Sequence, residues 1–253
     1  MQLSATDRLF VLTGAGISAE SGLATFRGSN GLWNGYRIEE VATPEAWRAN
    51  PALVWQFYSM RRREAMAARP NAAHQALAQL EKYMDGRFYL CTQNVDDLHE
   101  RAGSQQVHHM HGTLFCSRCV RCCQPFADTA FYETEDELPR CERCGDLVRP
   151  HIVWFGEIPL DLDGIYRKLE EATVLLVVGT SGSVYPAAGF VQVARQRGIP
   201  TIYAGPERPL NAEAFREIRL GTAVEMLPAW CEAACPEHAS AAEPSRATDA
   251  RSR

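Results

Sequence analysis

Short apolar runs recur along the chain, separated by stretches in which apolar residues repeat at helical spacing. Four of these runs cover residues 9–12, 88–92, 174–178 and 200–203. Runs with so little polar alternation are typical of strands buried on both faces of a parallel sheet. Between the first two runs, residues 72–84 place apolar side chains on one helical face, and Gly86 follows where such a helix ends. The pattern therefore predicts strands that alternate with helices.

Two prolines mark helix starts in the first quarter of the chain. Thr43-Pro44 and Asn50-Pro51 each place a capping side chain before a proline that suits the first helical position. The second helix should continue to about residue 68, and a later helix should cover residues 186–197. Because strands and helices alternate outside a cysteine-rich segment, we expect a doubly wound α/β fold around a parallel sheet, with insertions.

Composition narrows the class of protein. The 253 residues are 46% hydrophobic and 23% charged, with a formal net charge of −5, as in an ordinary globular protein. The acidic balance disfavours a broad nucleic-acid surface. No segment reaches the roughly 18 consecutive apolar residues of a membrane span, and the first ten residues lack the apolar run of a secretion signal. We therefore expect a cytoplasmic protein, with residues 236–253 forming a disordered tail.

A glycine-rich turn follows the first predicted strand. Residues 14–19 are Gly-Ala-Gly-Ile-Ser-Ala, a variant of the loop that lets a backbone approach a pyrophosphate at a helix N-terminus. An ordinary strand-to-helix turn is the alternative for this motif. The next residues, 21–28, are polar and glycine-rich, unlike a buried crossover helix. We therefore expect a loop that closes over a ligand, with Phe26 and Arg27 at its tip.

Polar residues follow two of the predicted strands at the point where each strand ends. Gln93, Asn94 and Asp96 come after the second run, and Gly-Thr-Ser at residues 179–181 comes after the third. Open α/β sheets bind ligands at the carboxyl ends of their strands. These groups are therefore candidates for hydrogen bonds to a ribose or a carboxamide. Capping of a helix by Asn94 or Asp96 is the alternative interpretation.

Six of the nine cysteines lie within residues 116–144, and such clustering in a cytoplasmic chain indicates metal binding rather than disulfides. Two Cys-x2-Cys pairs are separated by 18 residues, a spacing at which four thiolates can enclose a structural zinc ion. The two pairs are Cys119–Cys122 and Cys141–Cys144. Cys116 with Cys119 is a second candidate for the first pair, so the register stays open. Residues 116–150 hold five arginines and seven acidic residues, net −2, which disfavours nucleic-acid recognition by this segment.

Side chains suited to proton transfer and to anion binding occur in two further places. Of the three histidines in residues 108–111, His111 should lie where the chain leaves the sheet toward a cleft, so it is the predicted general base. Tyr58 and Arg61 share a face of the second predicted helix, and a phenol beside a guanidinium can receive a carboxylate. A solvated run of charge at residues 61–63 is the alternative for Arg61.

Taken together, these segments resemble the sirtuins, the NAD-dependent protein-lysine deacylases. The resemblance covers about residues 8–230 in the family's order, and the joint pattern is highly specific. Its motifs are Gly14-Ala15-Gly16-Ile17-Ser18, Phe26-Arg27-Gly28, Thr92-Gln93-Asn94-Val95-Asp96, His109-Met110-His111-Gly112, His151-Ile152-Val153-Trp154-Phe155-Gly156-Glu157, the two cysteine pairs, and residues 179–187. In sirtuins the first zinc cysteine typically falls eight residues after the catalytic histidine, which here selects Cys119 and Cys122.

The resemblance implies a catalytic domain over residues 1–235, built from a Rossmann-like large domain and a small zinc and helical domain. The large domain would comprise about residues 1–33, 71–115 and 150–235, and the small domain a helical insert at about 34–70 and a zinc module at about 116–149. NAD would be the co-substrate, with one structural Zn²⁺, and the partners would be acyl-lysine proteins or peptides, without nucleic acid or membrane. The acyl oxygen would attack C1′ of the nicotinamide ribose, and His111 would take a ribose hydroxyl proton. The products would be deacylated lysine, nicotinamide and O-acyl-ADP-ribose.

The resemblance also assigns binding roles to individual residues. NAD contacts would come from Gly14, Ala15, Gly16, Ser18, Phe26, Arg27, Trp33, Gln93, Asn94, Val95, Asp96, Gly179, Thr180, Ser181 and Ala223. Substrate contacts would come from Tyr58, Arg61, Val153, Phe155, Gly156 and Glu157, with the peptide pairing along the backbone near residues 153–157. Zinc would be held by Cys119, Cys122, Cys141 and Cys144.

Thr25, Gly31-Leu32-Trp33 and the Tyr58/Arg61 pair resemble the class III branch of sirtuins, in which a Tyr-x-x-Arg pair binds the carboxylate of succinyl, malonyl or glutaryl lysine. This implies removal of succinyl and malonyl groups, with deacetylation weaker or comparable. Two departures bear on the cofactor: Ala24 replaces a usual proline, and Gly205 falls where sirtuins usually carry an asparagine that contacts the adenosine ribose. Loss of that hydrogen bond is expected to cost about 1 kcal/mol of NAD binding.

Two rival functions stay open on the sequence. An NAD-dependent ADP-ribosyltransferase would use the same activated C1′ with another nucleophile, and a zinc-ribbon binding protein would sense NAD without turnover. His111 and the Tyr58/Arg61 pair favour deacylation, because a transferase needs neither an acyl pocket nor a base for the acyl step.

Overall fold

A computed structural model describes residues 1–25, 33–180 and 185–235 of the chain. Its larger part is a six-stranded sheet in the order β3-β2-β1-β7-β8-β9, with every neighbouring pair parallel. The strands are β1 (Leu9–Thr13), β2 (Phe88–Thr92), β3 (Val107–His109), β7 (Val174–Val178), β8 (Thr201–Gly205) and β9 (Glu217–Leu220). The order reverses between β1 and β7, which makes that point the expected ligand site of a doubly wound sheet.

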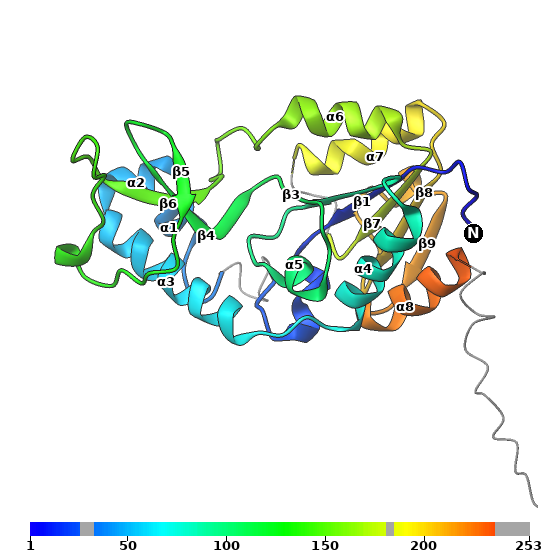
Figure 1. The fold of residues 1–253 in the computed structure, drawn as a ribbon, viewed down its shortest axis with the longest axis horizontal. Helices are drawn as coiled ribbons and strands as arrows, with labels where there is room; N and C mark the ends of the chain where they lie inside the picture. Colours follow the sequence, from blue (N-terminus) through cyan, green and yellow to red (C-terminus); the bar gives the residue numbers. More distant parts are fainter. Residues whose placement is uncertain (26–32, 181–184, 236–253) are drawn as a thin grey trace, which may run out of the picture.

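Helices cover both faces of this sheet (Figure 1). One face is covered by α4 (Ala72–Met84) and α8 (Ala223–Ala234), and the other by α6 (Leu162–Glu171) and α7 (Ala187–Gln196). Successive side chains of a strand point to opposite faces. Leu9 and Val11 accordingly join the core beneath α4 and α8, whereas Phe10 and Leu12 join the core beneath α6 and α7. The predicted doubly wound architecture is confirmed.

A second, smaller sheet lies at the other end of the molecule (Figure 1). It has the antiparallel order β5-β4-β6, formed by β4 (Gly112–Cys119), β5 (Pro125–Ala127) and β6 (Val148–Ile152). Beside it lie α1 (Ile38–Val41), α2 (Pro44–Ala49) and α3 (Pro51–Ala67). The indole of Trp55 on α3 donates to the carbonyl oxygen of Val148 at 2.9 Å, which ties this helix to β6.

The helix starts predicted from proline are confirmed. The Thr43 hydroxyl accepts a hydrogen bond from the amide of Ala46, and the Asn50 side chain accepts one from the amide of Leu53, each at 3.0 Å. Shorter elements complete the chain. They are α5 (Leu98–Ala102) and the 3-10 helices η1 (Ala15–Ile17), η2 (Ala19–Ser21), η3 (Glu135–Glu137) and η4 (Ala212–Ala214).

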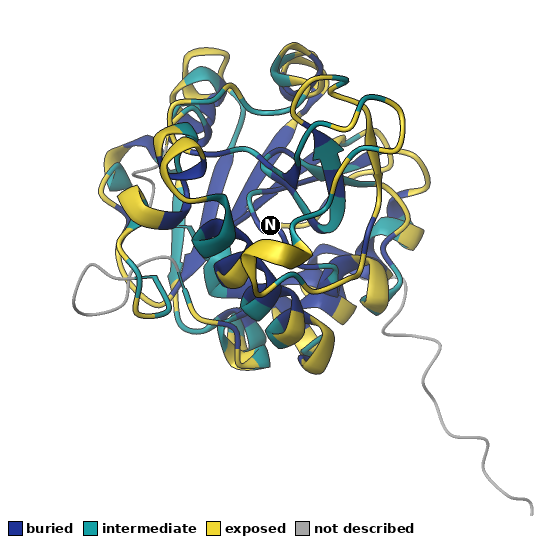
Figure 2. Ribbon diagram, turned by 90° about the vertical axis from the view of Figure 1, so that its left-hand side faces the viewer, coloured by how far each residue is buried: buried dark blue, intermediate teal, exposed yellow. Residues whose placement is uncertain are grey.

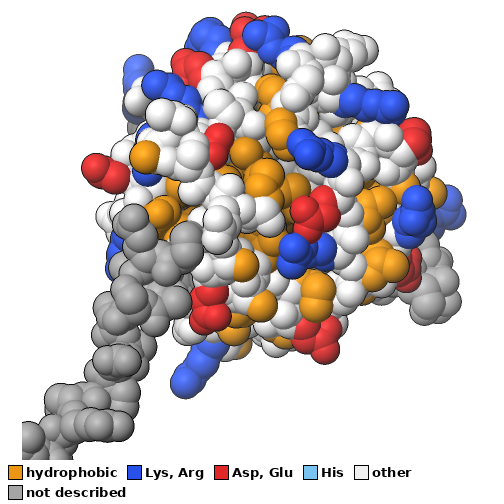
Figure 3. Space-filling model, turned by 90° about the vertical axis from the view of Figure 1, so that its right-hand side faces the viewer, with side chains coloured by type: hydrophobic (Ala, Val, Ile, Leu, Met, Phe, Trp, Pro, Cys, Tyr) orange, Lys and Arg blue, Asp and Glu red, His pale blue; other side chains and the backbone are white. Residues whose placement is uncertain are grey.

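Burial follows the layers of the fold. The four central strands of the large sheet are largely buried, its edge strands β3 and β9 are partly exposed, and the outward faces of the surrounding helices are exposed (Figure 2). In the described ranges, no helix combines the length and apolar character needed to cross a membrane. On the face that Figure 3 shows, hydrophobic side chains are interspersed with acidic and basic ones. The predicted tail, residues 236–253, lies outside the described residues.

The loops that follow β1 and β7 meet backbone to backbone at the carboxyl edge of the sheet. The Gly14 amide donates to the carbonyl oxygen of Val178 at 2.9 Å, and the Gly16 amide donates to that of Gly179 at 2.8 Å. Gly179 has a φ of +62°, and a Cβ added to Gly16 would lie 2.7 Å from the Cα of Gly179. Glycine is therefore required here by space as well as by conformation.

Gly16→Ala should lower the free energy of unfolding by about 1–3 kcal/mol, because it forces a methyl group into filled space. Gly189→Ala is the matched control. Its Cβ would approach nothing closer than 3.7 Å, and the position lies inside α7, where alanine favours the helix. Denaturant unfolding of both variants measures the difference, and a Gly16→Ala protein as stable as wild type would contradict the close approach.

Candidate active site

A cavity of about 420 Å³ opens at the carboxyl edge of the large sheet, between the glycine loops and the segment that follows β6. That volume is ordinary for a small-ligand site. The predicted site residues that line it are Gly14, Ala15, Gly16, Ser18, Trp33, Tyr58, Arg61, Gln93, Asn94, Val95, Asp96, His111, Val153, Phe155, Gly156, Glu157, Gly179 and Thr180. Phe26, Arg27 and Ser181 lie outside the described residues. Ala223 is buried at the start of α8 and does not line the cavity as the described residues define it.

A hydrogen-bonded polar cluster closes one end of the cavity. The Asn94 side-chain amide donates to the Ser18 hydroxyl at 3.1 Å, and that hydroxyl donates to the Asp96 carboxylate at 3.2 Å. The other carboxylate oxygen of Asp96 accepts from the amide of Leu98 at the start of α5. Asp96 therefore bonds the first backbone amide of α5, whose N-cap residue is Asp97, and it lines the cavity as well. Burial raises the pKa of its carboxyl, and the hydrogen bonds oppose that shift.

Two histidines that the sequence analysis missed lie behind this cluster. His74 approaches the Ser18 hydroxyl at 3.4 Å, and His99 approaches the Thr13 hydroxyl at 3.0 Å. Burial lowers the pKa of His74 to about 4 and that of His99 well below its ordinary value, so both imidazoles are neutral at pH 7. The available signal for His74 was its position among the apolar residues of the predicted helix at 72–84.

His111 is oriented for proton acceptance. Its Nδ1 lies 3.1 Å from the carbonyl oxygen of Gln93. Because a carbonyl only accepts, Nδ1 carries the proton and Nε2 keeps a free lone pair. Burial lowers the pKa of His111, against a smaller opposing effect of the Gln93 bond, so the imidazole is neutral at pH 7. A neutral histidine with an open Nε2 in a cavity can act as a general base.

Arg61 is buried at the α3 side of the cavity, so the alternative of a solvated charge run is wrong for this residue. Its side chain is 7% exposed, against 48% for Arg63 on the same helix. Nη1 lies 3.2 Å from a carboxylate oxygen of Glu64, and the guanidinium lies 5.1 Å from the centre of the Trp33 ring. Arg61 Nε is buried and finds no acceptor within the described part of the chain. Tyr58, one turn earlier, is 1% exposed and lines the same cavity.

Residues 153–157 form the wall opposite the glycine loops, and several of their polar groups are already engaged. The amide of Val153 donates to the carbonyl oxygen of His111 at 2.9 Å, and that of Phe155 donates to the carbonyl oxygen of Ala42 at 3.0 Å. The Glu157 carboxylate pairs with Arg149 at 2.7 Å. A peptide cannot pair with those two amides in this conformation, and Glu157 faces a protein cation.

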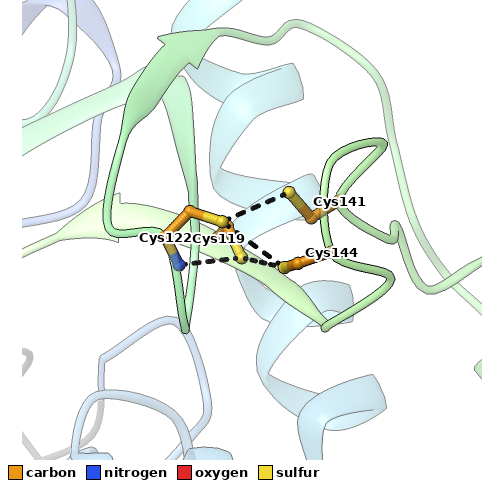
Figure 4. Close-up of side chains that lie close together, drawn as sticks. All are labelled: Cys119, Cys122, Cys141 and Cys144. Atoms are coloured by element: carbon orange, nitrogen blue, oxygen red, sulfur yellow. Dashed lines mark hydrogen bonds between the residues drawn. The ribbon is translucent and has the colours of Figure 1, made fainter.

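The four cysteines of the two predicted pairs converge (Figure 4). Their sulfur atoms all lie within 4.8 Å of one another, with Cys119 to Cys144 at 3.5 Å and Cys122 to Cys144 at 3.4 Å. Four thiolates bound tetrahedrally at the usual Zn–S distance are about 3.8 Å apart. The donor set and its spacing fit a structural zinc ion. Cys116, the other candidate for the first pair, lies outside this group, so the register that begins at Cys119 is confirmed; Cys123 is exposed and lies outside the group as well.

Comparison with known proteins identifies the family. The model of the Sir2 family matches residues 14–186. This chain belongs to the Sir2 family. An NAD-dependent protein deacylase of Caulobacter vibrioides is 52% identical to it over 228 residues, which cover 89% of this chain and 95% of the relative.

Solved Sir2 structures show that the similarity extends to the fold. A Sir2 homologue in complex with NAD aligns with a TM-score of 0.84 and 42% identity, over 92% of this chain and 91% of that one. A triple mutant of a Sir2 homologue in complex with 2′-O-acetyl ADP-ribose aligns with the same score and identity, over 92% and 94% of the two chains. The Sir2 fold explains why most of the predicted NAD-binding residues line one cavity.

One departure from the Sir2 pattern has a structural counterpart. A Cβ added to Gly205 would lie 2.3 Å from the hydroxyl oxygen of Tyr203, so the Tyr203 side chain fills the space that a larger residue 205 would need. Tyr203 and Glu207 both line the cavity, although the sequence analysis assigned neither to the site. Tyr203 lies in a predicted strand, where an aromatic residue is ordinarily read as core.

Cys141→Ser should abolish zinc binding and lower the thermal stability of the protein, because a three-thiolate remnant holds zinc poorly and the ribbon depends on it. The purified wild type should contain about one zinc per chain by elemental analysis. Cys123→Ser serves as the control and should keep its zinc, since Cys123 lies outside the cluster. Loss of zinc from Cys123→Ser with retention in Cys141→Ser would contradict the assigned ligands.

Proposed function

We propose that this chain uses NAD to remove acyl groups from protein lysines, and that it favours acyl groups that end in a carboxylate, such as succinyl and malonyl, while also removing acetyl groups. Family membership and the 52% identity to an NAD-dependent protein deacylase support the general activity. The observation that carries the acyl preference is the buried Arg61 guanidinium beside Tyr58, with an Nε that lacks an acceptor in the described chain.

The cavity suits NAD as the co-substrate. Gly14, Gly16 and Gly179 line the cavity and bring no side chains to it, so a pyrophosphate could approach the backbone of the two loops closely. Bound there, NAD would supply an electrophilic ribose carbon, C1′, from which nicotinamide leaves. The cluster of Asn94 and Asp96 would orient the nicotinamide and its ribose. His111 would accept a ribose hydroxyl proton at Nε2 and thereby raise the nucleophilicity of that oxygen.

The wall of the cavity that carries Tyr58 and Arg61 favours the binding of a negatively charged group. Burial lowers the pKa of Arg61, a sign that the cation is poorly solvated, and Glu64 offsets that effect only in part. A buried charge is costly unless it is paired and hydrogen-bonded. A carboxylate at the end of the acyl chain would accept from Arg61 Nε, whereas the methyl group of acetyl-lysine offers no acceptor. Tyr58 keeps its proton because burial raises the pKa of its phenol, so it can donate to the same carboxylate.

Arg61→Met should lower kcat/KM for a succinyl-lysine peptide about 10- to 100-fold relative to an acetyl-lysine peptide, since a hydrogen bond to a charged group is worth about 1.5–3 kcal/mol. Arg63→Met is the matched control on the same helix and should leave the ratio of the two substrates unchanged, because Arg63 is half-exposed. Deacylation and nicotinamide release are measured with saturating NAD. An unchanged ratio in Arg61→Met would remove the acidic-acyl preference.

His111→Tyr should abolish turnover of both peptides, and the wild-type pH profile should reflect a base with a lowered pKa. The neutral imidazole is the active form, and its pKa in the folded protein is lowered. The acidic limb of kcat/KM should therefore have its midpoint below about 6.5, the ordinary histidine value, with full activity at pH 7. A midpoint above 7 would contradict the assignment. Transfer of label from NAD onto protein without deacylation would favour an ADP-ribosyltransferase instead.

A further inference from the structure

The Tyr58 hydroxyl has a defined hydrogen-bond partner inside the protein. The indole Nε1 of Trp154 lies 3.1 Å from the Tyr58 oxygen, and the two side chains are 2% and 1% exposed. An indole N–H can only donate, so the tyrosine oxygen is the acceptor in this bond. The phenolic proton is then left for a different partner. Both residues line the cavity, so the phenolic proton can be donated to a group bound in the cavity.

Trp154 is itself held from two directions. Its backbone amide donates to a carboxylate oxygen of Glu157 at 2.8 Å, and its ring faces the Arg149 guanidinium, whose central carbon lies 3.2 Å from the ring centre. Arg149 donates to both oxygens of Glu157, at 2.7 and 2.9 Å, and to the carbonyl oxygen of Ile152 at 2.8 Å. A two-point guanidinium–carboxylate pair has a defined geometry. The indole orientation is therefore set by the pair.

These contacts join two walls of the cavity that are distant in sequence. Tyr58 belongs to α3, whereas Trp154 follows β6, and 96 residues separate them. The Trp154 ring also lies 5.9 Å from the ring of Trp47 on α2. A site side chain binds best when supporting residues restrict its orientation. The Trp154 N–H supplies such a restriction. It donates to the Tyr58 oxygen from one side, so the hydroxyl proton of Tyr58 must point away from the indole.

We propose that Trp154 is the positioning residue that directs the Tyr58 proton into the acyl pocket, and that the Arg149–Glu157 pair sets Trp154. This inference rests on the proposed acidic-acyl preference. A terminal carboxylate gains from a correctly aimed phenol, whereas an acetyl group makes no use of it. Trp154 therefore contributes to the choice between acyl groups as well as to the shape of the pocket. The role explains why Glu157, which lines the cavity, directs its carboxylate to Arg149.

The test compares kcat/KM for matched succinyl-lysine and acetyl-lysine peptides at saturating NAD. Trp154→Phe keeps an aromatic ring and removes the N–H donor, so the succinyl-to-acetyl ratio should fall about fivefold, the effect of one ordinary hydrogen bond. The fall should appear mainly in KM for the succinyl peptide. Trp47→Phe is the matched control, because it alters the neighbouring ring and leaves the Trp154 N–H in place, and it should preserve the ratio. An equal loss for both substrates in Trp154→Phe would overturn the inference in favour of a packing role.

A double-mutant cycle with Tyr58→Phe tests whether Trp154 changes the succinyl-to-acetyl ratio through the Tyr58 hydroxyl. If Trp154 acts through the Tyr58 hydroxyl, adding Trp154→Phe to Tyr58→Phe should leave the ratio where Tyr58→Phe alone puts it. The same fivefold fall in both backgrounds would overturn the inference. Arg61→Met separates this inference from the proposed function. A ratio that falls in Arg61→Met and not in Trp154→Phe removes only the role of Trp154, whereas a ratio unchanged in Arg61→Met removes the acidic-acyl preference as well.

A measurement on the wild-type side chain covers the case in which Trp154→Phe does not fold. With ¹⁵N-labelled tryptophan, the Trp154 indole N–H resonance can be followed by NMR during titration with a succinyl-lysine peptide. The resonance should shift on binding in wild type and should shift much less in Tyr58→Phe, because the tyrosine oxygen links the indole to the ligand. Equal shifts in the two proteins would contradict that link.

Discussion

In a parallel sheet every strand ends at the same edge, and that constraint gathers this site. The loops after β1, β2 and β7 emerge side by side because their strands are neighbours in register. Backbone bonds then lock the loops together: the Gln93 amide donates to the carbonyl oxygen of Thr13, and the Gly16 amide to that of Gly179. The polar cluster around Asn94 and the proposed base His111 both lie at this edge. The small sheet and α3 complete the cavity from the opposite side.

Electrostatics at the α3 wall underlies the proposed preference for acyl groups that end in a carboxylate. Arg61 is buried, and its carboxylate partner Glu64 is shared with Asn34, whose side-chain amide lies 2.8 and 2.9 Å from the two oxygens of Glu64. The cation is thus only partly compensated inside the protein. Tyr58, protonated and held by Trp154, adds a donor to the same wall. An acyl chain that ends in a carboxylate would supply the acceptor that Arg61 Nε lacks in the described chain. The imidazole of His111, at the other end of the cavity, is neutral and requires no charged partner.

Several helices, strands and site residues could be predicted from the sequence. The helix at 72–84 and the strands at 88–92 and 174–178 were predicted with their observed limits, because the two strands are short apolar runs and the helix keeps its apolar residues on one face up to Gly86. Helix α8 was missed, since Pro228 lies inside it and proline reads as a helix breaker. The His74 and Trp154 contacts were also beyond reach, because they join residues far apart in the chain. Domain boundaries, cytoplasmic location and the contacts of Phe26, Arg27, Ser181 and Ala223 stay predictions.

The most direct test of the central claim is a crystal structure of the protein with a bound succinyl-lysine peptide. The account predicts that the terminal carboxylate accepts hydrogen bonds from the Arg61 guanidinium and from the Tyr58 hydroxyl, with the Trp154 indole still donating to the Tyr58 oxygen. A carboxylate that points into solvent, with Arg61 paired to Glu64 alone, would contradict the account.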